Sequence, residues 1–282
     1  MMNYFRPQST EEALKLAQNP GMFFLAGGTD LILHMKDGIV KPNGLIDLGR
    51  IPDLQVIRQF EGCLEIGSMA TFADLGRSEL IREQAFALWQ ACQTMGSPQI
   101  RHQATLGGNL GNCSAAADGL SPLLALGAEV QLVSAKGEEK LPLAALLERS
   151  QLLESGTLIK GFVIPLHGWD SGFAKLGRRQ ALAIARLSAA IAVKRKDKVA
   201  VAVRVAFGAV GKRAFLSETL AQSLSGREMN DSWLEDAVKG SQTVIAESLG
   251  SRASAPYKRV AVGGVMRQAL DFALGGGKIG GD

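Results

Sequence analysis

Cysteine and histidine are scarce in this sequence. The three cysteines, at positions 63, 92 and 113, stand far apart, and no two of them have the CxxC spacing. They argue against a disulfide framework and are expected to be reduced thiols of a cytoplasmic protein. The three histidines, at positions 34, 102 and 167, form no i,i+4 pair and have no cysteine at ligand spacing, so no metal site is expected.

Aromatic residues and excess charge are also limited. Aromatics make up 6% of the 282 residues, and the formal net charge is +4. No stacking platform is evident, and the densest basic run, KRKDK at 194–198, is predicted to be a turn between two strands, so no nucleic-acid partner is expected. No uncharged apolar stretch reaches about 18 residues, which argues against a membrane span. The opening MMNYFRPQSTEEAL lacks the apolar segment of a secretory signal.

Short elements are predicted in the first 165 residues. Ser9 followed by Glu12 has the capping-box pattern and should begin a helix. An apolar stripe predicts one helix over 83–94. The stretch 96–112 shows neither the helical nor the strand periodicity of apolar residues, so it is predicted to be irregular and functional. The other predicted elements are strands at 22–26, 45–48, 64–67, 128–133 and 157–164 and a helix at 118–127.

The composition changes near HGWDSG, at 167–172, which predicts a domain boundary. Within 199–210, VAVAVRVAF alternates as a half-buried antiparallel strand does. Strands followed by helices favour an α+β arrangement over an alternating one. The predicted strands are 173–176, 188–194 and 199–210, and the predicted helices are 215–224, 231–248 and 256–274.

Glycine is abundant, with 33 residues. Two clusters stand between predicted elements, at 26–31 (AGGTDL) and 105–112 (TLGGNLGN). Glycine allows a ligand to approach the main chain, and successive N–H groups can then converge on an anion such as a nucleotide pyrophosphate. Each cluster alone is also consistent with a plain turn; together they suggest one ligand held from two sides.

Other nucleotide and catalytic motifs fail on spacing. Neither cluster gives G-x-G-x-x-G between a strand and a helix, which disfavours a Rossmann site. GAVGKR, at 208–213, lacks the four-residue gap and the Ser/Thr of a P-loop. No GxSxG elbow is present, although order alone does not exclude a Ser-His-Asp triad.

LAGGTDLI at 25–32 and ATLGGNLGNCSAAAD at 104–118 closely resemble the two flavin-binding signatures of the FAD subunits of molybdenum hydroxylases. These are the medium subunits of enzymes such as bacterial xanthine dehydrogenase and carbon monoxide dehydrogenase. The resemblance continues along most of the chain, through FRPQSTEEAL, PQIRHQATLGGN, FAKLGRR and VRVAFGAVG.

The resemblance implies the FAD-binding fold shared with vanillyl-alcohol oxidase and the peptidoglycan reductase MurB. An FAD-binding domain over 1–168, with α+β subdomains at about 1–55 and 56–168, would hold FAD between the subdomains. A C-terminal domain over 169–274 would contain a three-stranded antiparallel sheet and a three-helix bundle, and 275–282 would be a flexible tail.

The resemblance also assigns cofactor-binding residues and no catalytic ones. The first loop would wrap the FAD pyrophosphate with Leu25, Ala26, Gly27, Gly28, Thr29, Asp30 and Leu31. The second would line the flavin and phosphates with Ala104, Thr105, Gly108 and Asn109, and reach farther along the cofactor with Asn112 and Asp118. Further contacts would come from Ile159, Lys175 and Ile184, the last close to the isoalloxazine ring. The loop RRQALAIAR, at 178–186, is more apolar than is usual in the family, which leaves access to the flavin open.

The function implied is electron transfer within a complex. Electrons would come from two [2Fe-2S] clusters on a small subunit, after substrate oxidation at the molybdopterin of a large subunit, and leave through FAD to NAD+ or another acceptor. A dimer of heterotrimers would follow the family habit. Partners of similar medium subunits oxidise purines, nicotinate-type heterocycles, aldehydes and carbon monoxide, and overall likeness alone favours a purine such as xanthine. The alternatives are a stand-alone flavin oxidoreductase and a non-catalytic scaffold or assembly subunit of the same fold.

Overall fold

The computed structural model describes residues 2–177 and 184–275 of the chain, which divides into two compact units. Unit 1 comprises Met1–Arg77, Ser97–Cys113 and Ala128–Pro165. Unit 2 comprises Ser78–Gly96, Ser114–Gly127 and Leu166–Asp282. Each unit is thus assembled from three separate stretches of sequence. The tail expected at 275–282 lies, beyond its first residue, outside the described residues.

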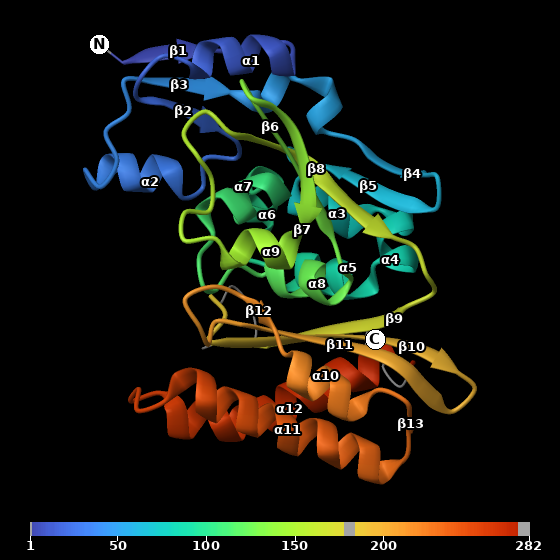
Figure 1. Cartoon of the computed structure of the whole chain (residues 1–282). Coiled ribbons are helices and arrows are strands. Elements are labelled where there is room, and N and C mark those ends of the chain that lie inside the picture. Colours follow the sequence, from blue (N-terminus) through green and yellow to red (C-terminus); the bar gives the residue numbers. More distant parts are fainter. Residues whose placement is uncertain (1, 178–183, 276–282) are drawn as a thin grey trace. The chain divides into compact units, whose positions relative to one another are not determined.

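Unit 1 begins with a small parallel sheet of strand order β1-β3-β2 (Figure 1). Its strands are β1 (Asn3–Phe5), β2 (Met22–Leu25) and β3 (Gly44–Asp47), with α1 (Thr10–Ala17) after β1 and α2 (Leu31–Lys36) after β2. Ser9 Oγ accepts a hydrogen bond from the Glu12 N–H at 3.2 Å, which confirms the predicted helix start. Ala13 and Ile46 are fully buried in the core between α1 and this sheet.

The second sheet of unit 1 is antiparallel, with strand order β4-β5-β8-β6-β7. The strands are β4 (Ile57–Phe60), β5 (Cys63–Gly67), β6 (Glu129–Ser134), β7 (Gly137–Pro142) and β8 (Leu158–Pro165). The turns η1 (Leu48–Arg50) and η2 (Pro52–Leu54) lead into it from β3. Helices α3 (Phe72–Arg77) and α9 (Leu143–Glu148) follow β5 and β7.

The segment 96–112, predicted to be irregular, contains two short helices in the structure. These are α6 (Pro98–Gln103) and α7 (Leu106–Asn112), so the prediction is wrong. Each begins at a side-chain cap, since Ser97 Oγ accepts from Ile100 N and Thr105 Oγ1 accepts from Gly108 N. Helices of six and seven residues are too short to show a period of 3.6, and three glycines in α7 hide its helical character.

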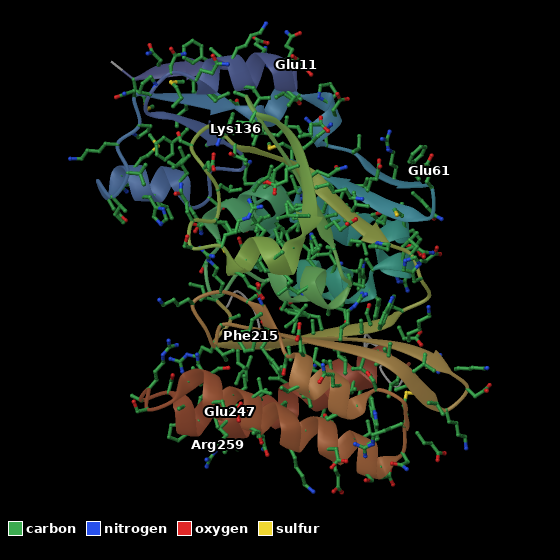
Figure 2. The ribbon with its side chains drawn as sticks, viewed as in Figure 1. Glu11, Glu61, Lys136, Phe215, Glu247 and Arg259 are labelled. Carbon is green, nitrogen blue, oxygen red and sulfur yellow. The ribbon has the colours of Figure 1, made fainter. Side chains whose placement is uncertain are left out.

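Unit 2 is built on the antiparallel strands β9 (Asp170–Leu176), β10 (Leu187–Lys196) and β11 (Val199–Gly208), as predicted. The two-residue strands β12 (Phe215–Leu216) and β13 (Arg227–Glu228) extend this sheet on β11. The KRKDK run is only partly the predicted turn, because residues 194–196 belong to β10 and only Asp197, at φ 53°, and Lys198 connect β10 to β11. Phe215, labelled in Figure 2, packs against Phe207 with the ring centroids 6.0 Å apart.

Both faces of this sheet are covered within unit 2 (Figure 1). Alternate residues of β10, such as Ile191 and Val193, belong to the core shared with α10 (Glu218–Leu224), α11 (Asp231–Leu249) and α12 (Ala255–Ala273). The opposite face meets α5 (Phe86–Thr94) and α8 (Leu120–Ala125), where Ser188 Oγ lies 3.3 Å from Ser121 Oγ. Because both faces of β10 are buried, its first seven residues, 187–193, are a continuous run of small or apolar residues without alternation.

The single helix predicted over 83–94 is two helices. α4 (Glu79–Gln84) ends and α5 begins at Ala85, where φ is −142° and ψ is 54°. Ala85 is fully buried, and its apolar side chain continues the stripe across the break. Hydropathy spacing therefore could not reveal the interruption.

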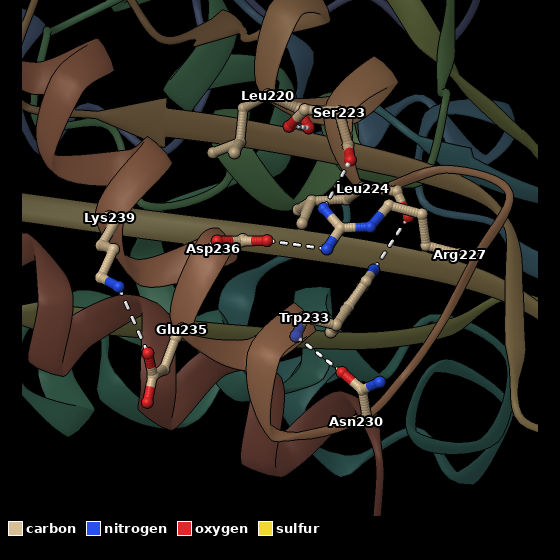
Figure 3. A network of polar contacts seen from close by, with 9 residues as sticks. All are labelled: Leu220, Ser223, Leu224, Arg227, Asn230, Trp233, Glu235, Asp236 and Lys239. Atoms are coloured by element: carbon tan, nitrogen blue, oxygen red, sulfur yellow. Dashed lines mark hydrogen bonds and ion pairs between the residues drawn. The ribbon is translucent and has the colours of Figure 1, made fainter.

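The helical layer of unit 2 is fixed by one buried tryptophan (Figure 3). Trp233 of α11 is fully buried and donates from Nε1 to the Leu224 carbonyl at the end of α10, at 2.8 Å. Asn230 caps α11 by accepting from the Trp233 N–H at 3.0 Å. Arg227 Nη2 lies 2.7 Å from Asp236 Oδ2 beside them. These contacts join α10, the turn and α11 into one layer.

Candidate cofactor site

The two glycine clusters predicted to share a ligand lie side by side in unit 1. A Cβ placed on Gly27 would stand 1.8 Å from the carbonyl oxygen of Gln103, immediately before the second cluster. A Cβ on Gly108 would stand 3.5 Å from the Cβ of Ala26. Only a residue without a side chain at position 27 permits this close approach, so the fold itself requires that glycine.

The first loop leaves backbone donors available. β2 ends at Leu25, Gly28 has φ +71°, and α2 begins at Leu31. Within the described part of the chain, the N–H groups of Gly28, Thr29 and Asp30 donate to no protein acceptor. The Thr29 hydroxyl lies 3.4 Å from Asp30 Oδ2. Three successive N–H groups without a described acceptor suit a phosphate-bearing ligand.

The second loop packs on the segment after β5. Gly107 N donates to the Ser68 carbonyl at 2.8 Å and Leu106 N to the Ala70 carbonyl at 3.0 Å. A Cβ on Gly107 would stand 2.5 Å from the Ser68 Cβ, so this glycine also serves the fold. Ala104 and Thr105 are buried, and Thr105 Oγ1 caps α7. Their side chains support the loop from inside.

The outer strip of α7 is left bare. A Cβ on Gly111 would meet only Ile159 Cδ1, at 3.8 Å, and Gly111 and Asn112 are exposed. Neither Gly108 nor Gly111 is required at its position by a clash with another backbone segment. Glycine in a helix costs about 1 kcal/mol relative to alanine, so two glycines that packing does not require are consistent with a surface that a ligand approaches closely.

Three further predicted site residues, Asp118, Lys175 and Ile184, belong to unit 2. Lys175 Nζ lies 2.6 Å from Asp118 Oδ2, and the two side chains are 8% and 7% exposed. Asp118 Oδ1 is buried and has no hydrogen-bond partner among residues 2–177 and 184–275. Burial raises the pKa of Asp118 above its ordinary range, and the adjacent Lys175 ammonium opposes that rise. Ile184 is 81% exposed.

The predicted residues therefore divide between the units. Unit 1 holds both glycine loops and Ile159, while unit 2 holds Asp118, Lys175 and Ile184. Residues 178–183, including Arg178 and Arg179, lie outside the described residues. Sequence reasoning missed Ser68, because it is distant along the chain from both glycine clusters. Its Oγ is buried beside Gly107 and has no hydrogen-bond partner among the described residues.

The residues present fit a dinucleotide such as FAD. Within unit 1, the N–H groups of the first loop that donate to no described acceptor match a pyrophosphate, and the bare strip of α7 admits an extended ligand. No metal alternative competes, since no group of three His, Cys, Asp or Glu within the described residues is placed to hold an ion. No described helix is both long and apolar enough to cross a membrane.

Family models match nearly the whole chain. The FAD binding domain in molybdopterin dehydrogenase matches residues 1–167, and the CO dehydrogenase flavoprotein C-terminal domain matches residues 172–273. The chain belongs to the family of FAD-binding medium subunits of molybdenum hydroxylases. This confirms the resemblance drawn from the two signatures and the expected α+β fold.

Individual relatives agree with this assignment. The chain is 30% identical over 276 residues to the nicotinate dehydrogenase FAD-subunit of Eubacterium barkeri, covering 94% of this chain and 93% of that one. It is 25% identical over 286 residues to the xanthine dehydrogenase FAD-binding subunit of Escherichia coli O157:H7, covering 98% of each. In structure it resembles a chain of carbon monoxide dehydrogenase from Hydrogenophaga pseudoflava, with a TM-score of 0.89, 25% identity and 97% of each chain covered.

Proposed function

We propose that this chain binds one FAD and carries electrons from the [2Fe-2S] clusters of a partner subunit to NAD+ or another acceptor. FAD, when bound, supplies the chemistry of taking up electrons singly and releasing them as a pair. The observation that carries the proposal is the meeting of the two glycine loops, with unused N–H donors at 28–30. Family membership supports it independently.

The residues of this chain would position the cofactor. The N–H groups of Gly28, Thr29 and Asp30 would hold the pyrophosphate without a lysine, and Gly108 and Asn109 would support it from the second loop. Asp118 would accept a hydrogen bond from a cofactor hydroxyl, and Lys175 would keep that carboxylate charged and oriented. Ile159 and Ile184 would contribute apolar contacts.

The partners follow from the same proposal. An iron–sulphur small subunit and a molybdopterin-binding large subunit would complete the enzyme, as a dimer of heterotrimers in the cytoplasm. The FAD-binding domain would span 1–168 and the C-terminal domain 169–274. The substrate oxidised by the large subunit would be a purine such as xanthine.

Absorbance of the purified chain tests the cofactor directly. The near-ultraviolet and blue bands of oxidised flavin should accompany the wild-type chain and be absent from Gly108→Trp, because the indole would fill the strip between α7 and Ala26. Gly264→Trp is the matched control. Gly264 is exposed on α12 and a Cβ there meets nothing within 4 Å, so this variant should keep its flavin.

Co-expression with the neighbouring iron–sulphur and molybdopterin genes tests the electron path. The flavin bands should bleach when xanthine is added and recover with NAD+. A chain that stays colourless with added FAD would refute the proposal and favour a scaffold subunit. A yellow chain that forms no complex and turns over a substrate alone would favour a stand-alone flavin oxidoreductase.

A further inference from the structure

Two cations of unit 2 contact the turn that follows β11, and a third, Arg186, lies within electrostatic range of one of them. Lys258 Nζ donates to the Ala209 carbonyl at 2.6 Å, and Arg252 Nη1 donates to the Val210 carbonyl at 3.4 Å. Arg186 lies within electrostatic range of the same lysine. The pKa of Lys258 is lowered from its ordinary value first by burial and then by the charges of Arg252 and Arg186. Like charges have therefore been gathered at a cost in electrostatic free energy.

This cluster contains no compensating carboxylate. In the part of the chain that the structure describes, Arg186, Arg252 and Lys258 take part in no ion pair, although eleven other pairs are present. A carbonyl oxygen carries only partial charge and takes one proton of each donor group. Lysine has three N–H donors and arginine has five, so several remain for a ligand. Arg186 and Arg252 are exposed and Lys258 is half-buried, so a soluble anion can reach them.

The cluster lies at the end of the sheet that also carries predicted flavin contacts. In the antiparallel register, Ser188 pairs with both Lys175 and Gly208, so β9 ends, β10 begins and β11 ends together. Arg186 N donates to the Leu176 carbonyl at 2.8 Å, one residue beyond Lys175. Ala209 N donates to the Ala115 carbonyl at 2.6 Å, in the loop that leads to Asp118. One residue, Ala185, separates Arg186 from the exposed Ile184.

We infer that Arg186, Arg252 and Lys258 form a second anion site, which holds the pyrophosphate of a soluble nicotinamide dinucleotide that accepts electrons from this subunit. The inference rests on the proposed function and extends it, because the first anion site, at 27–30 in unit 1, is assigned to FAD. The stretch GAVGKR, which fails as a P-loop, then has a role. It supplies the carbonyls that orient two of the cations, and it adds the exposed Lys212.

Calorimetric titration of the FAD-loaded chain with NAD+, and separately with inorganic pyrophosphate, tests the site. The double variant Arg186→Gln/Arg252→Gln should weaken NAD+ binding by about tenfold or more, since two charge-assisted contacts are removed. Lys258→Gln should weaken it similarly and Lys258→Arg should restore it. Raising the salt concentration should weaken binding to the wild type more than to the double variant.

The matched control is Arg267→Gln, which removes an exposed cation farther along α12 that forms no ion pair with any described residue. It should leave NAD+ binding unchanged. Flavin content, read from absorbance, should be the same in all five proteins, which shows that the first site is intact.

The outcomes separate this inference from the proposed function. A flavin-containing wild type that does not bind NAD+, or binds it equally well after the double substitution, overturns the inference and leaves FAD binding standing. Binding of pyrophosphate without NAD+ overturns the dinucleotide as occupant. Unchanged NAD+ binding with loss of a co-expressed partner subunit assigns the cluster to an acidic protein surface instead. If the chain holds no FAD, the proposed function fails, and pyrophosphate titration of the flavin-free chain still tests the cluster.

Discussion

Gly27 and Gln103 lie so close that a Cβ on residue 27 would stand 1.8 Å from the Gln103 carbonyl oxygen. The two residues come from separate stretches of unit 1 and join its two glycine loops. A distance of 1.8 Å between carbon and oxygen is impossible without moving one backbone. The geometry of the candidate cofactor site therefore depends on residue 27 being glycine, which has no Cβ.

Gly27→Ala should separate the loops and destabilise the chain. We expect a loss of about 3 kcal/mol in the free energy of unfolding, because backbone must shift to admit the methyl group. Urea unfolding followed by circular dichroism measures this. Gly111→Ala is the control, since its Cβ meets only Ile159 at an ordinary 3.8 Å and alanine is the better helix former. Equal stability of Gly27→Ala and wild type would contradict the close approach.

Gly28→Ala should weaken FAD binding more than its effect on stability suggests. Gly28 has φ +71°, so any other residue is strained by about 1 kcal/mol or more. Gly38 has φ +72° and open space around it, so Gly38→Ala carries the same strain away from the loop. Gly28→Ala should lose somewhat more unfolding free energy, because its Cβ also meets Ile32 Cγ1 at 3.2 Å and Leu25 Cδ1 at 3.3 Å, but only Gly28→Ala should lose flavin. Flavin content of the two variants is measured by absorbance after dialysis. Equal flavin content in both would contradict the assignment of the first glycine loop to FAD binding.

Asp118 should give the chain a measurable pH dependence of stability. Burial raises the pKa of Asp118 above its ordinary value of 3.8, and Lys175 opposes this without cancelling it. Between pH 3.8 and the raised native pKa, the native state therefore holds more protons than the unfolded chain. The contribution of this group to the free energy of unfolding falls as the pH rises through that window. It is constant below and above it.

Asp118→Asn should remove that slope, which urea titrations at a series of pH values would measure on flavin-free protein. It also leaves the Lys175 ammonium buried without its partner, so we expect a loss of about 3 kcal/mol or more near neutral pH. The double variant Asp118→Asn/Lys175→Met removes both charges and should recover much of the loss. An unchanged slope in Asp118→Asn would assign the pH dependence to another group.

Trp233→Phe should loosen the helical layer of unit 2. Phenylalanine cannot donate to the buried Leu224 carbonyl and leaves space in a fully buried position. We expect a loss of about 2–4 kcal/mol from the orphaned acceptor and the cavity together. Trp169→Phe is the control, because Arg204 stacks on that ring at 4.3 Å and a phenyl face preserves most of the contact. Thermal unfolding of the two variants should therefore differ clearly.

Local chemistry made much of the fold predictable. The Ser9–Glu12 pattern is a hydrogen bond between neighbours in sequence, so it could be predicted without tertiary information. The alternation of apolar residues in 199–210 likewise predicts β11 from local pattern alone, and the long segments with helical periodicity form α11 and α12. The break at Ala85 and the helices α6 and α7 were missed, because helix breaks and helices of fewer than two turns are set by caps and contacts that leave no periodic pattern in the sequence.

By itself, the sequence determined the longer elements, the two glycine loops and the family, since each depends on residue types at fixed spacing. Only the tertiary structure explains why residue 27 is a glycine, because the backbone of Gln103, far along the chain, leaves no room for a side chain there. It also decided that Asp118 faces Lys175 in a buried pair with one unused oxygen. The gathering of Arg186, Arg252 and Lys258 had no signal in the sequence either. Antiparallel pairing brings the ends of β9 and β11 and the start of β10 to one edge, and only there do these distant charges meet.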